Sequence, residues 1–597
     1  MLRTHTCGEL RKKHAGTEVT LAGWVNRRRD HGGLIFIDLR DRYGVVQTVF
    51  DPDASTSALH LAEEMRSEYV VRVKGEVSIR PKGTENPKLS TGDIEVTVKE
   101  SEILNTSELP PFYINEDIEV DESLRLKYRY LDLRRLHLKE NLMLRHRVVR
   151  FMRDFLDARG FVEVETPVFI KSTPEGARDY LVPSRLHPGC FYALPQSPQQ
   201  LKQLLMVGGM DRYYQMARCF RDEDSRADRQ PEHTQLDVEM SFVTQEDILT
   251  LIEELFTALV KAVKPGSRVI KPFPRLSYAE AMERYASDRP DLRFGLEIAD
   301  ITDIAAKTEF GVFQTAISGG GKVKCLTAPG CGEYSRGQLE ELNRVAVEAG
   351  AKGLLTISLG TSGGVLEDLK MEMVKSVAAK FLSLEQVKEI AARSRAGKGD
   401  LLLIVAGNTD DIYPVLDKLR REVGRRCELI EPDFYAFTFI IDFPLLIRNE
   451  DTGQLEAANN PFTMPRDEDI PLLDSTPEKV FGKNYDLVCN QLELLSGSVR
   501  IHTSSLQRKI LKILGYQDET VESLFGHMLE ALDFGAPPHG GFGAGIDRII
   551  MCLTGEDSIR EVVAFPKTQS AADLTLGAPS PVTQEQLDEL HISLLEE

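Results

Sequence analysis

Hydrophobic and polar residues alternate along the first hundred residues in five short runs. Three runs lie between residues 19 and 50, separated by breaks at residues 30–33 and 43–44, and two more span residues 69–79 and 94–98. Alternation with a period of two predicts strands, and breaks rich in glycine predict hairpin turns. Five short strands in such a segment predict a small closed barrel of the OB type.

The pattern changes beyond the barrel. Residues 107–140 are rich in Pro, Glu and Arg and predict a hinge, and apolar residues at helical spacing from Val148 to Leu156 then predict a helix that ends at Gly160. The run FVEVETPVF follows. Because Pro167 stands near its end, we expect this strand at a sheet margin or a subunit boundary.

Residues 220–242, FRDEDSRADRQPEHTQLDVEMSF, combine dense charge with a strand pattern. They predict a charged loop followed by a half-buried strand, in which Leu236, Val238 and Met240 alternate with polar residues. Arg221 at the end of the preceding strand, with Glu223 two residues later, can clamp a nucleotide phosphate through its forked guanidinium. A solvated, salt-bridged hairpin has the same composition, so this segment alone leaves both interpretations open.

Residues 291–431 bring helices and strands of their own, including LLLIVAG at 401–407, and predict an inserted α+β domain. The apolar run FYAFTFIIDFPLL then predicts a strand buried on both faces. In YDLVCNQLELLSGSVRIH, Asp486, Glu493 and Arg500 are seven residues apart, and we expect the break between two strands at residues 496–498. Finally, GGFGAGIDRII joins a glycine-rich strand to a helix through Arg548, as suits a nucleotide that approaches the backbone.

The predicted division of the chain is a barrel (1–106), a hinge (107–140), a central domain in two parts (141–290 and 432–565), the insertion (291–431) and a C-terminal extension (566–597). The net charge of −20 argues against a general nucleic-acid coat, so any nucleic acid must meet local basic patches. In the barrel, Arg28 and its neighbouring arginines lie beside Phe36 and Gln47, as a face for single-stranded bases requires, although Phe36 could equally be core.

Eight cysteines without a CxxC pair indicate a reducing cytoplasm, and no apolar run approaches the length of a membrane span. The loop TPEGARDY has the composition of a lid over a ligand. Beyond it, Gln199 and Lys202 share one face of a helix that begins near Pro198. A lysine there is either exposed or aimed into a pocket, and the sequence leaves the choice open.

Three segments together resemble the signature motifs of class II aminoacyl-tRNA synthetases: the helix and strand up to Pro167, the hairpin that begins at Phe220, and Gly541 to Arg548. The barrel, TPEGARDY, QSPQQLKQ and AFPKTQSAADLTLGAPS narrow the resemblance to the bacterial-type aspartyl-tRNA synthetases, along nearly the whole chain. The resemblance implies an antiparallel catalytic sheet, a homodimer, and a two-step reaction in which ATP and aspartate form an aspartyl-adenylate that then esterifies the 3′ end of a tRNA.

The resemblance also implies roles for individual residues. Arg221, Glu223 and Arg548 would be catalytic, and Mg²⁺ would lie at Asp486 and Glu493, since this hard cation prefers carboxylates and phosphate oxygens. ATP would be bound by Arg221, Asp222, Glu223, Gln230, Glu493, Gly545, Ile546, Asp547 and Arg548. Aspartate would be bound by Glu175, Gln199, Lys202, Arg221, Asn459 and Arg500. The anticodon would be read by Arg28, His31, Phe36, Gln47, Gly83 and Glu95.

Residue chemistry favours an acidic substrate as well. If Lys202 and Arg500 converge on the substrate side chain, two cations call for a carboxylate, whereas asparagine would leave both cations unpaired. An asparagine-activating relative and a catalytically silent RNA-binding relative are the alternatives. One departure concerns Asn459-Asn460, where bacterial members usually carry a histidine pair, because an asparagine cannot become cationic.

The resemblance leaves open whether tRNA(Asp) alone or also tRNA(Asn) is the substrate. His31 and Gly83 resemble the type that charges tRNA(Asn) as well as tRNA(Asp) with aspartate, because small or adaptable groups beside the third anticodon base exclude less. Such an enzyme needs an amidotransferase downstream to convert the mischarged product.

Overall fold

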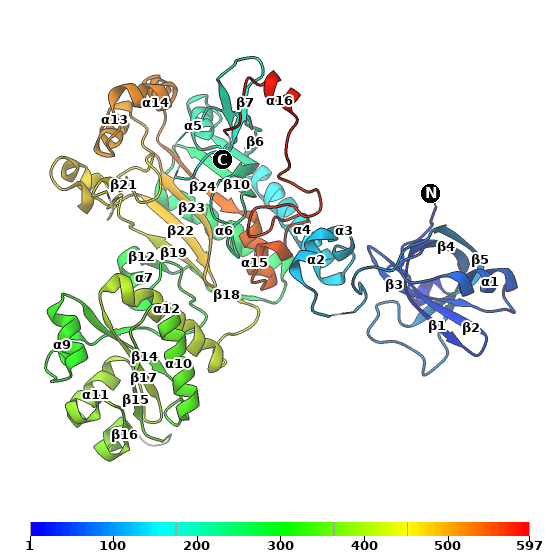
Figure 1. Cartoon of the computed structure of the whole chain (residues 1–597), viewed down its shortest axis with the longest axis horizontal. Helices are drawn as coiled ribbons and strands as arrows, with labels where there is room; N and C mark the ends of the chain where they lie inside the picture. The colour runs from blue at the N-terminus through cyan, green and yellow to red at the C-terminus, as the bar shows by residue number, and fades with distance from the viewer. Residues whose placement is uncertain (1, 117, 174–175, 362–364, 450–451, 596–597) are drawn as a thin grey trace. The chain divides into compact units, whose positions relative to one another are not determined.

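The computed structural model describes residues 2–116, 118–173, 176–361, 365–449 and 452–595. The chain divides into two compact units, residues 1–143 with 560–581 and residues 144–559 with 582–597. The barrel strands, drawn in blue in Figure 1, belong to the first unit. In the described part of the chain, no helix combines the length and the apolar character that a membrane span requires.

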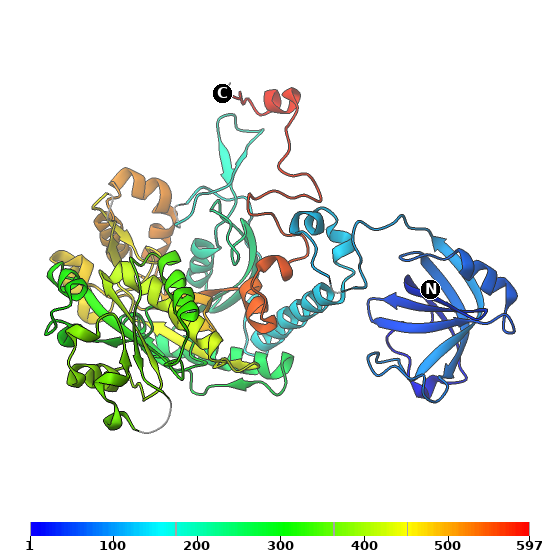
Figure 2. The same cartoon turned by 60° about the horizontal axis from the view of Figure 1, so that its bottom comes forward.

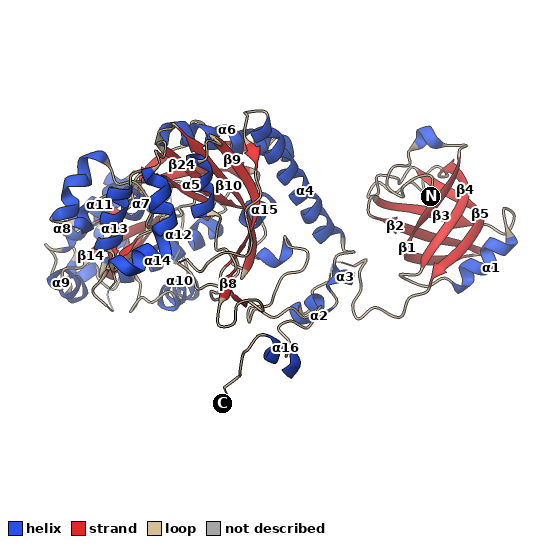
Figure 3. Ribbon diagram, turned by 90° about the horizontal axis from the view of Figure 1, so that it is seen from above, coloured by secondary structure: helices blue, strands red, loops and turns tan. Residues whose placement is uncertain are grey.

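The N-terminal strands close into a barrel in the order β1-β2-β3-β5-β4. Ile35 and Ile37 on β2 point inward to its core, and the alternate residue Phe36 lies half-buried on the outer side. Phe36 is therefore not a core residue. Figure 3 shows helix α1 beside the strands. The bounds are β1 Glu18–His31, β2 Leu34–Asp41, β3 Gly44–Phe50, α1 Thr56–Glu64, β4 Val70–Ile79 and β5 Ile94–Asn105.

Short helices follow the barrel: α2 Glu122–Lys127, α3 Arg129–Asp132 and the long α4 Leu136–Asp157. Gly160, just beyond α4, has a φ of 76°, which suits the predicted glycine cap. The strand expected at 161–169 is only two residues long, β6 Val162–Glu163, and it lies at the sheet edge as predicted.

The second unit is built on an eight-stranded sheet in the order β12-β19-β22-β23-β24-β10-β9-β6. The six inner strands are antiparallel, and the pairs at both edges, β12 with β19 and β6 with β9, are parallel. The bounds are β9 Arg212–Phe220, β10 Glu232–Ser241, β12 Arg275–Ser277, β19 Phe437–Ile441, β22 Asn484–Cys489, β23 Leu492–Val499 and β24 His539–Gly545.

Helices and small hairpins surround this sheet, and Figure 2 shows the hairpin β7–β8 projecting from it. The helices are α5 Gln199–Val207, α6 Gln245–Val263, α7 Tyr278–Tyr285, α13 Ser504–Ile513, α14 Asp518–Asp533, α15 Ile546–Thr554 and α16 Gln584–Glu589. The small sheets pair β7 Leu181–Pro183 with β8 Phe191–Ala193, β11 Arg268–Val269 with β18 Phe434–Tyr435, and β20 Leu446–Arg448 with β21 Leu455–Ala457.

Between β12 and β19 the chain forms a separate five-stranded sheet, β13-β14-β17-β15-β16, covered by helices. Its strand β17 Leu401–Gly407 coincides with the predicted run LLLIVAG. The other elements are β13 Ala299–Asp300, α8 Thr302–Ala305, α9 Gly311–Ser318, β14 Lys322–Ala328, α10 Arg336–Glu348, β15 Leu355–Leu359, β16 Val374–Lys375, α11 Leu384–Arg393 and α12 Thr409–Arg426.

Two local expectations are wrong. The break between β22 and β23 lies at Asn490–Gln491, and residues 496–498 continue β23. Gly497 serves close packing there, since a Cβ would stand 2.4 Å from the carbonyl oxygen of Gly541. The strand β10 is not half-buried either, because its polar residues Asp237 and Glu239 are as buried as the apolar ones beside them.

Candidate nucleotide and amino-acid site

A cavity of about 590 Å³ lies over β10, β22, β23 and β24 in the second unit. The sheet supplies its floor, and α5, the β9–β10 loop and the start of α15 supply its walls. Twelve residues that the sequence nominated line it together: Gln199, Lys202, Arg221, Glu223, Gln230, Asn459, Asp486, Glu493, Arg500, Gly545, Asp547 and Arg548.

Two nominated residues lie outside the lining, and the structure does not describe a third. Asp222 is outside the lining, and its backbone N–H donates to the carbonyl of Arg178 at 3.0 Å. Ile546 is buried in the core at the start of α15. Glu175 lies outside the described residues. Asp547 lines the cavity, but its carboxylate also pairs with Arg145 of α4.

Arg221 stands at the point where β9 ends. Its backbone N–H donates to the carbonyl of Pro231 at 2.8 Å, which closes the base of the β9–β10 loop. Its side-chain Nε is buried and has no hydrogen-bond partner among the described residues. An unsatisfied buried donor costs about 1–3 kcal/mol, and a phosphate or carboxylate oxygen in the cavity would remove that cost.

Arg548 approaches the cavity from the first turn of α15. Its Nη2 lies 3.0 Å from Oδ2 of Asp228 in the β9–β10 loop, and its Nη1 donates to the backbone carbonyl of Glu493 at 3.2 Å. The side chain is 17% exposed. This guanidinium is therefore held between the β9–β10 loop and strand β23, with part of its surface open to a ligand.

Asp486 and Glu493 enter the cavity from adjacent strands. The pairing of β22 with β23 shifts register so that Leu494 is an extra residue, a bulge that reorients Glu493. Burial, and then the charge of Glu493, raise the pKa of Asp486 well above its ordinary value. Oδ1 of Asp486 is buried without a hydrogen-bond partner in the described structure. A cation between the two carboxylates would relieve both the repulsion and the unsatisfied oxygen.

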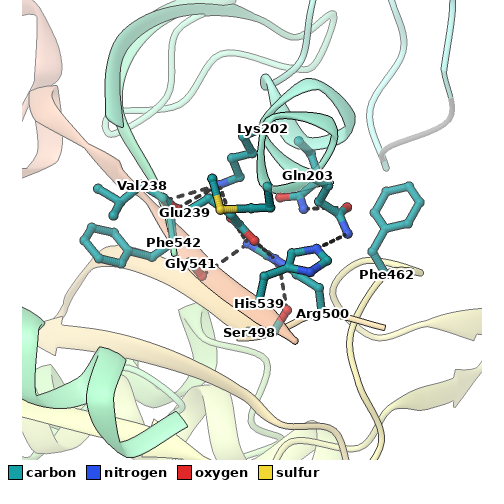
Figure 4. A network of polar contacts seen from close by, with 12 residues as sticks. Lys202, Gln203, Val238, Glu239, Phe462, Ser498, Arg500, His539, Gly541 and Phe542 are labelled. Carbon is teal, nitrogen blue, oxygen red and sulfur yellow. Dashed lines mark hydrogen bonds and ion pairs between the residues drawn. The ribbon is translucent and has the colours of Figure 1, made fainter. Parts of the chain in front are cut away.

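Lys202 and Arg500 meet at the buried carboxylate of Glu239 (Figure 4). Nζ of Lys202 lies 3.2 Å from Asp237 and 3.3 Å from Glu239, while Nε of Arg500 donates to Glu239 at 3.0 Å. Nη1 of Arg500 also donates to the hydroxyl of Ser498 at 2.7 Å. Lys202 is thus aimed into the site and is not exposed.

The two carboxylates differ in their electrostatics. Burial raises the pKa of Asp237, whereas at Glu239 the charges of Arg500 and Lys202 outweigh burial and lower the pKa. These partners correct the sequence argument for an acidic substrate: Lys202 and Arg500 are already paired, so an asparagine substrate would not leave them bare. Position 541 has room only for glycine beside this network, because a Cβ there would stand 2.0 Å from the carbonyl oxygen of Val238.

Sequence reasoning missed Asp237 and Glu239, and it missed His233. The signal for the pair was two acids two residues apart that alternate with apolar residues. His233 also lines the cavity, where burial and the nearby Arg221, Arg218 and Arg548 lower its pKa to about 3. It is therefore a neutral imidazole at physiological pH.

Asn459 lines the mouth of the cavity and is exposed. Its Nδ2 donates to the hydroxyl of Ser496 at 2.8 Å. Ser496 stands on β23, beside the bulge that carries Glu493. Asn459 is thus tied to the cavity floor and can offer its amide oxygen to a ligand.

In the first unit, the nominated barrel residues lie on β1, β2, β3 and β5 and in the β4–β5 loop. Gln47 accepts from Arg29 at 3.0 Å and donates to Glu95 at 2.8 Å, and the rings of His31 and Phe36 meet edge to face at 6.1 Å. Arg28 donates to the carbonyl of Ala62. Gly83, in the β4–β5 loop, has a φ of 91°.

Comparison with known proteins identifies the family. Residues 121–569 match the family described as tRNA synthetases class II (D, K and N). The chain belongs to the class II tRNA synthetases. Residues 19–104 of the synthetase match the OB-fold nucleic acid binding domain, which confirms the predicted barrel and the predicted family.

Curated relatives match along the full length. The synthetase is 58% identical over 594 residues to the aspartate–tRNA(Asp/Asn) ligase of Dehalococcoides mccartyi (strain CBDB1), covering 100% of this chain and 99% of the relative. It is 54% identical over 592 residues to the protein of the same name from Rubrobacter xylanophilus, covering 99% and 97%.

Solved structures share the fold. Asparaginyl-tRNA synthetase from Pyrococcus horikoshii, complexed with asparaginyl-adenylate, has a TM-score of 0.58 at 19% identity and covers 95% of this chain and 99% of its own. Aspartyl-tRNA synthetase from Entamoeba histolytica has a TM-score of 0.57 at 19% identity, covering 95% and 91%. At this identity the likeness establishes the class II fold and does not distinguish the amino acid.

Proposed function

We propose that this synthetase ligates L-aspartate to the 3′ end of tRNA(Asp) through an aspartyl-adenylate made from ATP. The observation that carries the proposal is the buried Nε of Arg221, which lacks a partner among the described residues and lies in the same cavity as the Lys202–Arg500 network and Arg548. A donor that shares one cavity with an amino-acid pocket and a second arginine suits a reaction that joins a carboxylate to a phosphate.

In the first step a carboxylate oxygen of aspartate attacks the α-phosphorus of ATP, and pyrophosphate leaves. Arg221 would hold the α-phosphate and the attacking carboxylate, Glu223 and Gln230 would bind the nucleotide, and Arg548 would hold the γ-phosphate. In the second step a ribose hydroxyl of the terminal tRNA nucleotide attacks the aspartyl carbonyl, and AMP leaves. The chain's contribution to both steps is positioning and charge stabilisation.

Magnesium fits Asp486 and Glu493. Two facing carboxylates, one with an unsatisfied buried oxygen, are donors that this hard cation accepts together with phosphate oxygens. The bound ion would supply neutralisation of phosphate charge. The side chains of Asp486 and Glu493 would orient it beside Arg548.

The proposed tRNA specificity is dual. His31 is exposed at the end of β1. Gly83 has a left-handed backbone and, as a glycine, presents no side chain at its position in the β4–β5 loop. The full-length relatives named above carry the name aspartate–tRNA(Asp/Asn) ligase. A synthetase of this kind requires a tRNA-dependent amidotransferase downstream, and its eight free cysteines suit the cytoplasm.

The proposed assembly is a homodimer. The edge strand β6 and the segment after it present exposed apolar side chains, Val162, Val168 and Phe169, which are 49%, 44% and 59% exposed. Apolar residues at an open sheet edge favour pairing with another chain. Light scattering on the eluting protein tests this, and a monomeric active species would refute it.

The deciding experiment is aminoacylation with labelled aspartate on separate transcripts of tRNA(Asp) and tRNA(Asn). Charging of both supports the proposal, and His31→Leu should then lower charging of tRNA(Asn) selectively. Charging of tRNA(Asp) alone would refute dual specificity. Activation of asparagine in preference to aspartate would establish the alternative, an asparagine-activating enzyme.

A further inference from the structure

The turn between β22 and β23 has a strained backbone. Asn490 and Gln491 have φ values of 50° and 77°. Two successive residues with positive φ form the type I′ hairpin turn, whose second position ordinarily belongs to glycine. A glutamine persists in this conformation only where surrounding contacts fix it, and such residues cluster at functional sites.

The side chain of Asn490 fixes one side of the turn. Its Oδ1 accepts from the backbone N–H of Ala436 at 3.1 Å, and its Nδ2 donates to the carbonyl of Phe434 at 3.0 Å. Phe434 and Ala436 are the residues at which the chain returns from the five-stranded sheet to the central one. The side-chain amide of Asn490 therefore holds the backbone at the point where the chain returns from the five-stranded sheet.

Gln491 fixes the other side. Its Nε2 donates to Oδ2 of Asp291 at 3.1 Å, and Asp291 lies where the chain departs toward the five-stranded sheet. The carboxylate of Asp291 is fully buried, and Nη2 of Arg293 donates to it at 2.6 Å. Adjacent residues of one turn thus hold the departing segment and the returning strand.

Helix α12 of the five-stranded domain contacts the departing segment. Its Arg420 is fully buried and donates to the carbonyls of Asp291 and Phe294 at 2.7 and 3.0 Å. Phe294 packs on Gly424 of the same helix, where a Cβ would stand 2.8 Å from the phenyl ring. Asp291 is therefore in contact with α12 through its backbone carbonyl and with Gln491 through its carboxylate.

The turn leads directly to the cavity. Glu493 follows Gln491 by two residues, and its backbone carbonyl accepts from Arg548. We propose that the Asn490–Gln491 turn is a positioning device through which the five-stranded domain sets the place of Glu493 and Arg548, and hence binding of the β- and γ-phosphates. The inference deepens the proposed function and rests on it for the nucleotide.

Gln491→Gly tests the device. Glycine accepts the left-handed backbone more readily than glutamine and removes only the anchor on Asp291. We measure binding of ATP and of AMP to the full-length protein by titration calorimetry in magnesium buffer, since AMP lacks the γ-phosphate assigned to Arg548 and the β-phosphate that carries it. The expected result is an ATP affinity lowered about tenfold, of the order that a small misplacement causes, with AMP affinity within about twofold.

Two further variants complete the test. Asp211→Gly is the matched control, because Asp211 has a φ of 49° in an exposed turn and its side chain makes no hydrogen bond to the described residues. It should leave both affinities unchanged. Gln491→Lys, which restores an N–H donor toward Asp291, should recover much of the ATP affinity.

The outcomes separate cleanly. ATP affinity that is unchanged in Gln491→Gly, or that falls equally with AMP affinity, would overturn the positioning role, as would an equal effect of Asp211→Gly. A wild-type protein that binds neither nucleotide would overturn the proposed function and this inference with it. Wild-type binding of both with a selective loss in Gln491→Gly supports both.

Discussion

Arg500→Lys is the substitution that best probes the amino-acid pocket. The guanidinium makes four hydrogen bonds in the free protein: two to Glu239 at 3.0 and 3.3 Å, one to Ser498 at 2.7 Å and one to the carbonyl of Gly541 at 3.2 Å. A lysine keeps the positive charge, but its single ammonium cannot span the carboxylate, the hydroxyl and the carbonyl together. The substitution therefore keeps the positive charge and removes the forked hydrogen-bonding geometry of the guanidinium.

The magnitude follows from the lost bonds. Hydrogen bonds to charged groups contribute about 1.5–3 kcal/mol each, so losing one or two of them in a buried site costs about 3 kcal/mol. At about 1.4 kcal/mol per factor of ten, the kcat/KM for aspartate should fall about a hundredfold. Aspartate-dependent pyrophosphate exchange measures this, and filter binding measures affinity for the tRNA, which we expect to change by less than about twofold.

The control is Arg268→Lys, an exposed arginine that pairs with Glu431 at 3.0 Å. Surface pairs of this kind contribute at most about 1 kcal/mol, so its exchange rate should match the wild type. If Arg500→Lys lost tRNA affinity as strongly as aspartate activation, or if activation fell by less than about threefold, the assignment of Arg500 to the amino acid would be wrong.

Three other substitutions give separate tests. The pKa of His233 is lowered to about 3, so the unfolded chain binds a proton at this residue more readily than the folded protein does. The free energy of unfolding should therefore decrease by about 1.4 kcal/mol per pH unit as pH falls below about 6.5. His233→Gln should remove this contribution in denaturant titrations at pH 7 and 5. Burial and the charge of Glu493 raise the pKa of Asp486, so removal of this carboxylate charge in Asp486→Asn should stabilise the fold by about 1–3 kcal/mol in calorimetry. The same substitution should abolish magnesium-dependent exchange, and retained exchange would contradict the role of Asp486. Gly497→Ala should cost stability, visible as a lower Tm, because its Cβ would stand 2.6 Å from the ring of Tyr485.

Much of the fold was predictable because its signals are local. The five barrel strands follow from alternation and turn glycines, and β17 and the β9–β10 hairpin follow from apolar runs with polar breaks. The break between β22 and β23 was misplaced because a Ser-Gly-Ser triplet is a stronger turn signal than Asn-Gln. What decided between them was contact with Asp291 and Phe434, which no local pattern encodes.

The site also contains residues that local sequence identifies and residues that only tertiary contacts bring together. Motif residues such as Arg221 and Arg548 could be nominated because their neighbours in the sequence define them, and the structure places both in one cavity. The partners that tune the site could not. Asp237 and Glu239 become important only because α5 brings Lys202 over β10, and β23 brings Arg500 beside it.

The charge balance of that network changes the account of substrate choice. Lys202 and Arg500 carry two positive charges, and Asp237 and Glu239 can carry two negative ones, so the network is neutral when both carboxylates ionise. Selection of aspartate over asparagine therefore cannot rest on bare cations. We propose that it rests on the hydrogen bonds that the fork of Arg500 can redirect to a substrate carboxylate, and on Asp237, whose burial favours the neutral form and leaves the cations in excess. The class II fold is shared by aspartyl and asparaginyl enzymes, so this small network, and not the sheet that holds it, is where the two specificities can diverge.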